Sequence, residues 1–141
     1  MVTEKKVLYP ELSYKIVGCA FEVFNEIGPG HKELTYQKAM KAAFDEARIM
    51  HKDNLYWPIK FKSVVVEKGF FDFSVEDKIV VELKARDNFL KKDFEQLNNY
   101  LVNAEMKLGI LICFGSEIVV YKRVLNTVLL NQEKVSGTSS S

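Results

Sequence analysis

The sequence predicts an α/β fold in which a mixed central sheet is flanked by helices, as one domain over residues 1–131. Three observations carry this prediction. Apolar residues recur at three- and four-residue spacing in three long segments, which is typical of amphipathic helices. Segments rich in aromatic and β-branched residues stand between and after these helices, which is typical of strands. The length of 141 residues suits a single hydrophobic core.

Two helices are expected first. The apolar spacing predicts one over residues 11–26, with Ser13 as its N-cap. The sequence Gly-Pro-Gly at 28–30 ends it, because glycine accepts the left-handed cap and proline cannot continue the turn. A second helix is predicted over residues 32–48, and Glu33 falls in its first turn.

Extended chain follows the helices. Residues 51–54 are polar and predict a loop. Residues 55–66 favour a strand, and Pro58 places it at a sheet edge or interrupts it, because proline cannot donate a ladder hydrogen bond. Residues 67–69 are expected to turn the chain into a hairpin over 70–85.

A third helix is predicted over residues 86–105, with Asp87 or Asn88 as its cap. The apolar run 107–114 is typical of a strand that is buried on both faces, and 117–124 is the last predicted strand. The strand before the third helix and the buried strand after it are therefore expected to form a parallel crossover.

Composition sets limits on the class of protein. The net charge of +1 neither supports nor excludes a nucleic-acid partner. No apolar run approaches a membrane span and no signal core is visible, so we expect a cytoplasmic protein with no membrane partner. Cys19 and Cys113 stand in apolar segments and are expected to be buried, reduced thiols. The polar segment 132–141 is expected to be a disordered tail.

The hairpin can be paired residue by residue. A three-residue loop at 76–78 brings apolar residues opposite one another. The expected pairs are Val75 with Ile79, Phe73 with Val81, and Phe71 with Leu83. The same register places Asp72 across from Glu82, with Lys84 on the same face as Glu82.

This juxtaposition needs a physical reason, because like charges that face each other on a sheet are destabilising. A divalent ion such as Mg²⁺ would be shared by Asp72 and Glu82, since it commonly takes one or two carboxylates and several waters. Lys84 would reach the same reacting group. A solvated strand face is the alternative explanation for the charges.

The segment from Gly30 to Tyr36 carries Gly, Glu33 and Tyr at the spacing G-x-x-E-x-x-Y. It resembles the motif that names the GxxExxY proteins, a family of the PD-(D/E)xK nuclease-like superfamily. The resemblance covers residues 12–124, and Gln96 with Tyr100 is similar to the Q-x-x-x-Y motif of RecB-type nucleases. Phe71 stands where the superfamily's name has proline. The resemblance implies a restriction-endonuclease-like core.

The resemblance also implies roles. Asp72, Glu82 and Glu33 would bind Mg²⁺ or Mn²⁺, and Lys84 would position or activate the attacking water, so that these four form the catalytic set. For Glu33, helix-dipole complementarity is the simpler explanation. Gln96 and Tyr100 would contact the nucleic-acid backbone or orient the site; a polar flank beside the apolar stripe of the helix is the alternative.

Further candidates to bind nucleic acid or orient the site are Tyr36, on the same side of its helix as Glu33, and Arg86, two residues beyond Lys84. Other candidate backbone contacts are Lys32, Lys91, Lys92 and Arg123.

The expected function is a metal-dependent nuclease that hydrolyses phosphodiester bonds in DNA or RNA. The alternative is a non-catalytic module that keeps the nuclease fold and binds nucleic acid or protein. The near-neutral net charge of +1 favours this module, and the intact Asp72, Glu82 and Lys84 favour the nuclease. A homodimer is compatible with the small size of the domain.

Overall fold

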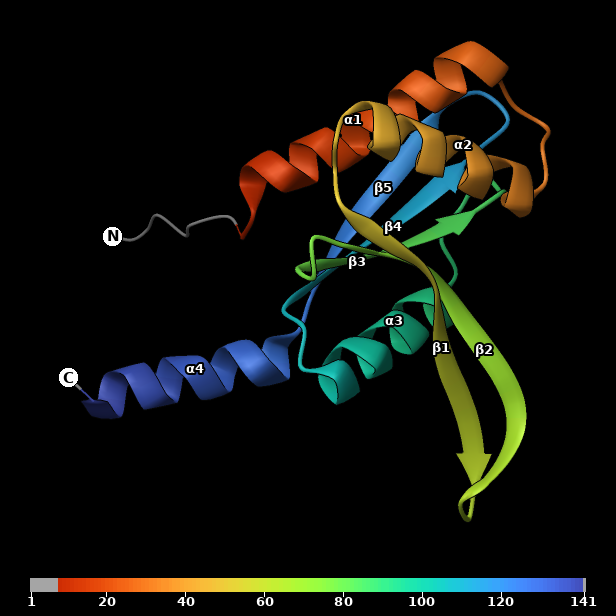
Figure 1. The fold of residues 1–141 in the computed structure, drawn as a ribbon. Coiled ribbons are helices and arrows are strands. Elements are labelled where there is room, and N and C mark those ends of the chain that lie inside the picture. Colours follow the sequence, from red (N-terminus) through yellow and green to blue (C-terminus); the bar gives the residue numbers. More distant parts are fainter. Residues whose placement is uncertain (1–7, 141) are drawn as a thin grey trace.

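A five-stranded sheet forms the centre of the molecule (Figure 1). The structure is a computed structural model that describes residues 8–140, with side chains through residue 134. The strands are β1 His51–Phe61, β2 Val64–Val75, β3 Ile79–Lys84, β4 Leu108–Phe114 and β5 Val119–Leu125. They stand in the sheet in chain order. Only the β3–β4 neighbours run parallel, so the sheet is mixed, as the sequence predicts.

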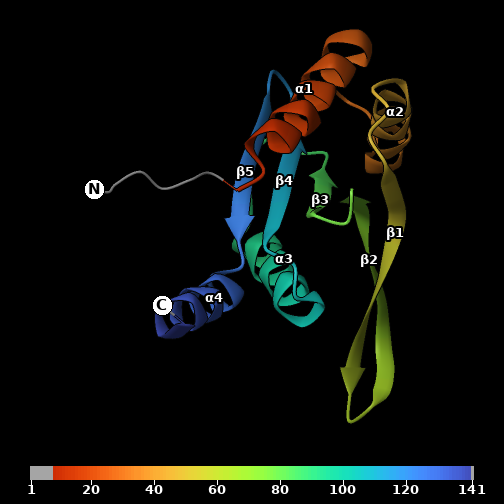
Figure 2. The same ribbon diagram turned by 60° about the vertical axis from the view of Figure 1, so that its left-hand side comes forward.

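Helices cover both faces of this sheet. Within the described residues the helices are α1 Pro10–Ile27, α2 Glu33–Glu46, α3 Lys91–Ala104 and α4 Thr127–Ser140. Figures 1 and 2 show α1 and α2 together on one face and α3 on the other. Helix α3 connects the parallel strands β3 and β4, which confirms the predicted crossover. No helix in the described range is long and apolar enough to cross a membrane.

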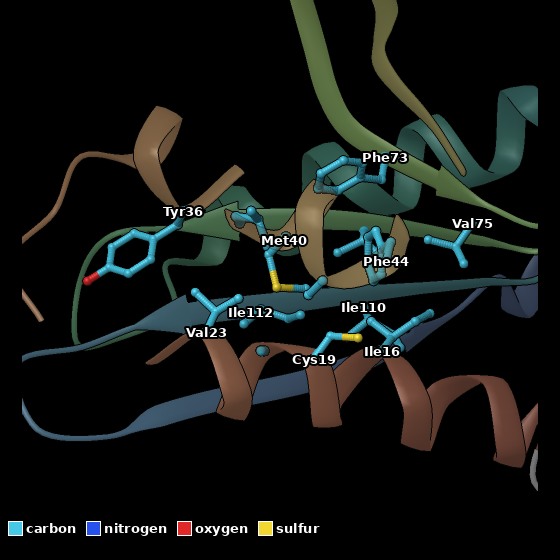
Figure 3. Close-up of a cluster of buried hydrophobic side chains, with 14 of the residues drawn as sticks. Ile16, Cys19, Val23, Tyr36, Met40, Phe44, Phe73, Val75, Ile110 and Ile112 are labelled. Atoms are coloured by element: carbon cyan, nitrogen blue, oxygen red, sulfur yellow. The ribbon is translucent and has the colours of Figure 1, made fainter. Parts of the chain in front are cut away.

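The larger core lies between the sheet and the α1–α2 pair (Figure 3). Every residue of β4 is buried, which confirms the expectation for this apolar run. Cys19 from α1 belongs to this core and Cys113 lies in β4; both are free and buried, as predicted. Burial raises the pKa of both thiols to about 11, so neither forms a thiolate readily at neutral pH.

The first two strands differ from the prediction. Residues 51–54 belong to β1, not to a loop, and β2 runs unbroken through the expected turn at 67–69. The turn lies instead at Lys62 and Ser63, where φ is 49° and 69°. Two positive φ angles build the hairpin turn that matches strand twist. Because neither residue is glycine or asparagine, the sequence carries no signal for it. Pro58 lies on an edge strand, as expected.

Gly69 is needed in the strand for a close approach. A Cβ at this position would stand 2.8 Å from the carbonyl oxygen of Trp57, its cross-strand partner. The glycine therefore marks tight backbone packing within the β1–β2 hairpin and not a turn.

Two predicted helix caps are wrong. Helix α1 begins at Pro10, and Ser13 lies in its first turn, where its N–H donates to the carbonyl of Tyr9. Proline is favoured at a first helical position because its missing N–H needs no partner there. Helix α3 begins at Lys91, so Asp87 lies outside it and accepts hydrogen bonds from Ser116.

Helix α4 follows the sheet and extends through Ser140. It covers most of the segment 132–141, for which a disordered tail stays a prediction; residue 141 lies outside the described residues. Asn126 starts the helix, because its buried side chain accepts the Leu129 N–H at 3.0 Å and donates to the carbonyls of Leu101 and Met106.

Candidate active site

The candidate site lies where strands β2 and β3 stop pairing. Their ladder contains the pairs Val75/Ile79, Ser74/Val80 and Phe73/Val81, which confirms the predicted register. The ladder ends there, although β2 extends back to Val64 and β3 extends on to Lys84. The next two residues in register are Asp72 and Glu82.

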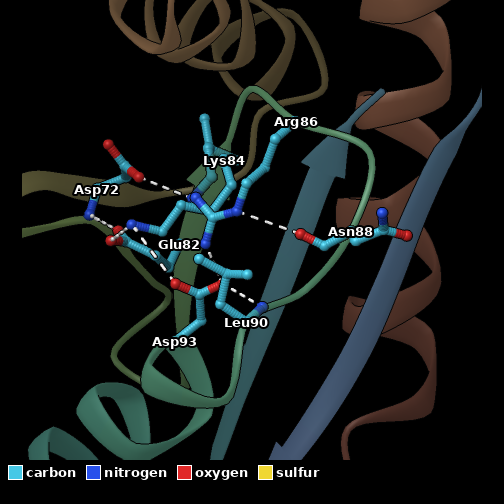
Figure 4. Close-up of polar contacts among 8 residues, drawn as sticks. Asp72, Glu82, Lys84, Arg86, Asn88, Leu90 and Asp93 are labelled. Carbon is cyan, nitrogen blue, oxygen red and sulfur yellow. Dashed lines mark hydrogen bonds and ion pairs between the residues drawn. The ribbon is translucent and has the colours of Figure 1, made fainter. Parts of the chain in front are cut away.

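Side chains replace the backbone ladder at this break (Figure 4). The Asp72 N–H donates to Oε1 of Glu82 at 3.1 Å, and Oδ2 of Asp72 accepts the Leu83 N–H at 2.8 Å. Each carboxylate thus satisfies a backbone donor that lost its ladder partner, which a buried N–H requires. This pairing holds both carboxylates side by side.

The alternation of β2 changes at Asp72. Phe71, Phe73 and Val75 were predicted to share one face, with Phe71 opposite Leu83. In the structure Phe73 packs into the core beneath α1 and α2, whereas Phe71 packs into a second cluster with Leu97 and Leu101 of α3. Strand β2 therefore rotates as it leaves β3, and the predicted Phe71/Leu83 pair is wrong. The change coincides with a gap in the β1–β2 pairing. Asp53 pairs with Phe73 and Leu55 with Phe71, but Asn54 between them, whose φ is 52°, has no partner in the ladder.

Burial makes charge costly for both carboxyl groups. Burial is the main cause that raises the pKa of Glu82 to about 9, followed by the hydrogen bond to Asp72 and the negative charge of that residue. The pKa of Asp72 is also raised, first by burial. Glu82 therefore retains a proton at neutral pH. A divalent cation would displace that proton, because metal ligands must be deprotonated.

Lys84 lies on the same face and is shared between two acids. Its Nζ is 3.5 Å from Oε2 of Glu82 and 4.0 Å from Oδ1 of Asp93. Only 17% of the Lys84 side chain is exposed. The Lys84 ammonium group is therefore held beside the carboxylate pair, and a small part of the side chain remains exposed to solvent.

Asp93 is a site residue that sequence reasoning missed. It is 2% exposed, and its Oδ2 accepts hydrogen bonds from the Arg86 guanidinium and, at 2.9 Å, from the Leu90 N–H. Burial pushes its pKa up, but these two donors outweigh burial and hold the pKa below its usual range. Asp93 lies in the first turn of α3, but the helix was predicted to begin at residue 86, and that misplaced start hid the signal of an acid in a first turn.

Glu33 approaches the site from the other face of the sheet. It is the first residue of α2 and is exposed, and its charge contributes to the raised pKa of Asp72. It does not join the carboxylate pair as a third ligand: in the described part of the chain, no three acidic, histidine or cysteine side chains gather closely enough to hold an ion.

Tyr36 faces the core and not solvent. It is 1% exposed and stacks on Phe114, with ring centroids 4.1 Å apart. Its hydroxyl donates to the carbonyl of Gly28 at 2.8 Å. The side chain therefore fixes the loop that delivers Glu33 to the start of α2, and its burial leaves no surface for direct contact with a substrate.

The two residues of the Q-x-x-x-Y motif have different surroundings. Gln96 is exposed on α3. Tyr100 is partly buried, and its ring lies 4.7 Å from that of Phe71 and 5.3 Å from that of Trp57. Burial raises the pKa of Tyr100. This residue links α3 to the β1–β2 hairpin.

The basic residues that were predicted to contact a nucleic-acid backbone also differ in their exposure. Lys32, Lys91 and Lys92 are exposed. Arg86 is engaged by Asp93, and its Nε also donates to the carbonyl of Asn88 at 3.2 Å. Arg123 is partly buried and donates to the carbonyl of Leu8, so it is less available than the three lysines.

Comparison with known proteins assigns the chain to a superfamily. A search of curated proteins found no match. The solved structure described as "Crystal structure of SSO0001" aligns over 100% of this chain and 80% of that chain, with a TM-score of 0.47 and 15% sequence identity. The family profile of the PD-(D/E)XK nuclease superfamily matches residues 10–125, which include every element from α1 to β5. The chain therefore belongs to the PD-(D/E)XK nuclease superfamily.

Proposed function

We propose that this protein is a metal-dependent nuclease that hydrolyses phosphodiester bonds in DNA or RNA. The observation that carries the proposal is the pair of half-buried carboxylates, Asp72 and Glu82, at a break between two strands with Lys84 beside them. Membership of the nuclease superfamily supports it. A structural role alone would not require two acids to share one desolvated position.

The donor set fits a hard divalent ion. Asp72 and Glu82 would hold Mg²⁺ or Mn²⁺ through oxygen atoms, and waters would complete the shell. A bound ion supplies a water of lowered pKa and positive charge for the phosphate oxygens. Glu33 is near enough to influence Asp72 electrostatically and would contribute through a water or after a change of side-chain rotamer.

Lys84 would orient the attacking water and offset the charge that develops on the phosphate. Its present contacts suit this role, because Glu82 and Asp93 restrict the ammonium group to one side. Arg86 would face the next phosphate along the strand, with Asp93 fixing its guanidinium.

We further propose that the chain is a GxxExxY protein within the superfamily. Glu33 of that motif starts α2, and Tyr36 anchors the preceding loop. The motif would therefore present one carboxylate at a defined place beside the carboxylate pair.

A cleavage assay tests the nuclease proposal. Purified protein would be incubated with Mg²⁺ or Mn²⁺ and a panel of single- and double-stranded DNA and RNA. We expect cleavage that EDTA abolishes and that Asp72→Asn or Lys84→Ala reduces by at least about a hundredfold. Asp77→Asn is the matched control, because Asp77 is an exposed acid in the adjacent turn and forms an ion pair with Lys52 at the surface. Cleavage that survives Asp72→Asn and Lys84→Ala would disprove the mechanism.

A non-catalytic binding module is the second candidate. One observation favours it: Glu33 does not converge with the carboxylate pair in the described residues. Titration calorimetry with Mn²⁺ separates the two candidates. Heat of binding that disappears in Asp72→Asn supports the nuclease, and the lack of any binding by the wild-type protein supports the module.

A further inference from the structure

The β1–β2 hairpin extends beyond the break at Asp72 as a free arm. We define the arm as residues 55–71. Figures 1 and 2 show it projecting away from the rest of the sheet, with its turn at the far end. The arm carries large apolar side chains that are exposed to solvent: Tyr56, Ile59, Phe61, Val64, Val65, Val66 and Phe70. Such a concentration on one projecting element indicates a binding surface.

Two aromatic rings form the centre of this surface. Tyr56 and Phe70 are cross-strand partners, and their ring centroids lie 5.5 Å apart at an interplanar angle of 48°. They are 50% and 54% exposed. At the same level of the arm, Trp57 and Phe71 pack on Tyr100 of α3. The core-facing side of the arm is thus already occupied, and the Tyr56–Phe70 pair points outward.

Positive charge surrounds the ring pair. The arm contains three lysines and one glutamate, a net charge of +2, while the whole chain carries +1, so the remainder carries −1. Lys68 lies two residues before Phe70 on β2 and therefore on the same face of the strand. Lys60 lies four residues after Tyr56 on β1, directly beyond the register shift between Ile59 and Lys60. Exposed aromatic faces flanked by cations suit bases and phosphates of a nucleic acid.

We propose that the arm binds an unpaired nucleic-acid strand and leads it to the carboxylate pair. Bases would stack on Tyr56 and Phe70, and Lys60 and Lys68 would contact phosphates. Phe70 is two residues from Asp72 on the same strand, roughly 7 Å at about 3.3 Å per residue. A duplex would not suit the rings, because its base faces are already stacked on one another. The link to cleavage rests on the proposed nuclease function; the binding itself does not.

Fluorescence anisotropy in EDTA tests the binding without cleavage. The probes are 5′-fluorescein-labelled dT20 and rU20, with a dA20·dT20 duplex as comparison. We expect Tyr56→Ala and Phe70→Ala each to raise the Kd for the single strands about tenfold, the effect of losing one stacked base. Tyr56→Phe and Phe70→Tyr should retain affinity because they retain a ring. Tyr14→Ala is the matched control, since Tyr14 is 82% exposed on α1, away from the arm.

A second pair of variants tests the cations. Lys60→Glu and Lys68→Glu should weaken binding and flatten its dependence on salt, because fewer counterions are released. Lys38→Glu, an exposed lysine on α2, should have no such effect. Thermal unfolding of each variant confirms that the fold is retained.

Several results would overturn the proposal. These are no binding of wild-type protein to either single strand up to about 100 µM, wild-type affinity in both alanine variants, or an equal ring-dependent affinity for the duplex. A fourth is loss of a dimer in the arm variants by analytical ultracentrifugation, which would assign the surface to a second copy of the chain. The nuclease proposal can fail separately. Single-strand binding without metal-dependent cleavage would contradict the nuclease proposal and would leave the proposed role of the arm in binding intact.

Discussion

The backbone N–H of Asp72 donates to the carboxylate of Glu82 across 3.1 Å, at the point where the ladder between β2 and β3 ends. This contact ties the local fold to the candidate chemistry. The strands separate because β2 rotates toward α3, and the two acids satisfy the donors that the separation exposes. The same separation leaves both carboxylates in one half-buried place, where a cation would relieve their repulsion.

Metal-free protein should lose stability as pH rises. The pKa of Glu82 is raised from 4.5 to about 9 in the folded state, so between these values the folded protein holds more protons than the unfolded chain. The free energy of unfolding therefore falls as pH rises through this window. Asp72 acts in the same direction. Thermal unfolding in EDTA at pH 5, 7 and 8.5 should show a decline on the order of a few kcal/mol.

Glu82→Gln should remove most of this decline. Glutamine keeps an oxygen that accepts the Asp72 N–H but carries no charge to bury. We expect the variant to match wild type at pH 5 and to exceed its unfolding temperature at pH 8.5. Glu95→Gln, at an exposed position on α3, is the control and should follow the wild-type curve. A pH-independent wild type would contradict the assignment of a raised pKa.

Mn²⁺ should stabilise the protein through the same pair. A ligand that binds only the folded state at a hundredfold excess over its Kd adds about 2.7 kcal/mol to the free energy of unfolding. We expect Mn²⁺ to raise the unfolding temperature of wild type at pH 8 and to leave Asp72→Asn unchanged. Asp77→Asn should respond like wild type. An equal response in Asp72→Asn would place the ion elsewhere.

Local alternation was sufficient to predict the pairing of the carboxylates. The apolar residues of β3 occupy alternate positions, and only one register brings them opposite the apolar residues of β2 near the turn. That register alone places Asp72 next to Glu82. The complete burial of β4 was readable for a similar reason, because a strand covered on both faces needs no polar positions.

The remaining features depend on packing between distant segments. The rotation of β2 follows from Phe71 joining the α3 cluster while Phe73 joins the core on the opposite face, and a single strand does not encode that choice. Asp93 becomes part of the site only because the end of β3 brings Arg86 and Lys84 to it. The turn at Lys62 and Ser63 has no glycine or asparagine to reveal it.

Asp93 should act as a positioning residue. Asp93→Asn removes the charge that holds Arg86 and lies near Lys84. We expect a loss of about 1–3 kcal/mol in the free energy of unfolding, because a charged hydrogen bond is lost in a buried place. Cleavage should slow with little change in the Mn²⁺ affinity measured by calorimetry, since Asp93 does not contact the carboxylate pair. Asp93→Glu, which restores the charge, should recover part of the rate. Unchanged cleavage in a folded Asp93→Asn would remove Asp93 from the mechanism.

Tyr36→Phe should separate anchoring from binding. The variant keeps the ring that stacks on Phe114 and loses the hydroxyl that donates to Gly28. We expect a loss of about 0.5–1.5 kcal/mol in urea unfolding, the usual net value of one hydrogen bond. Its Kd for dT20 should equal that of wild type, because the side chain is 1% exposed and cannot touch a strand on the surface. Tyr14→Phe is the control, because the Tyr14 side chain is exposed on α1. Loss of its hydroxyl should alter neither the free energy of unfolding nor the Kd. A rise in Kd for Tyr36→Phe at unchanged stability would instead assign the hydroxyl to substrate binding.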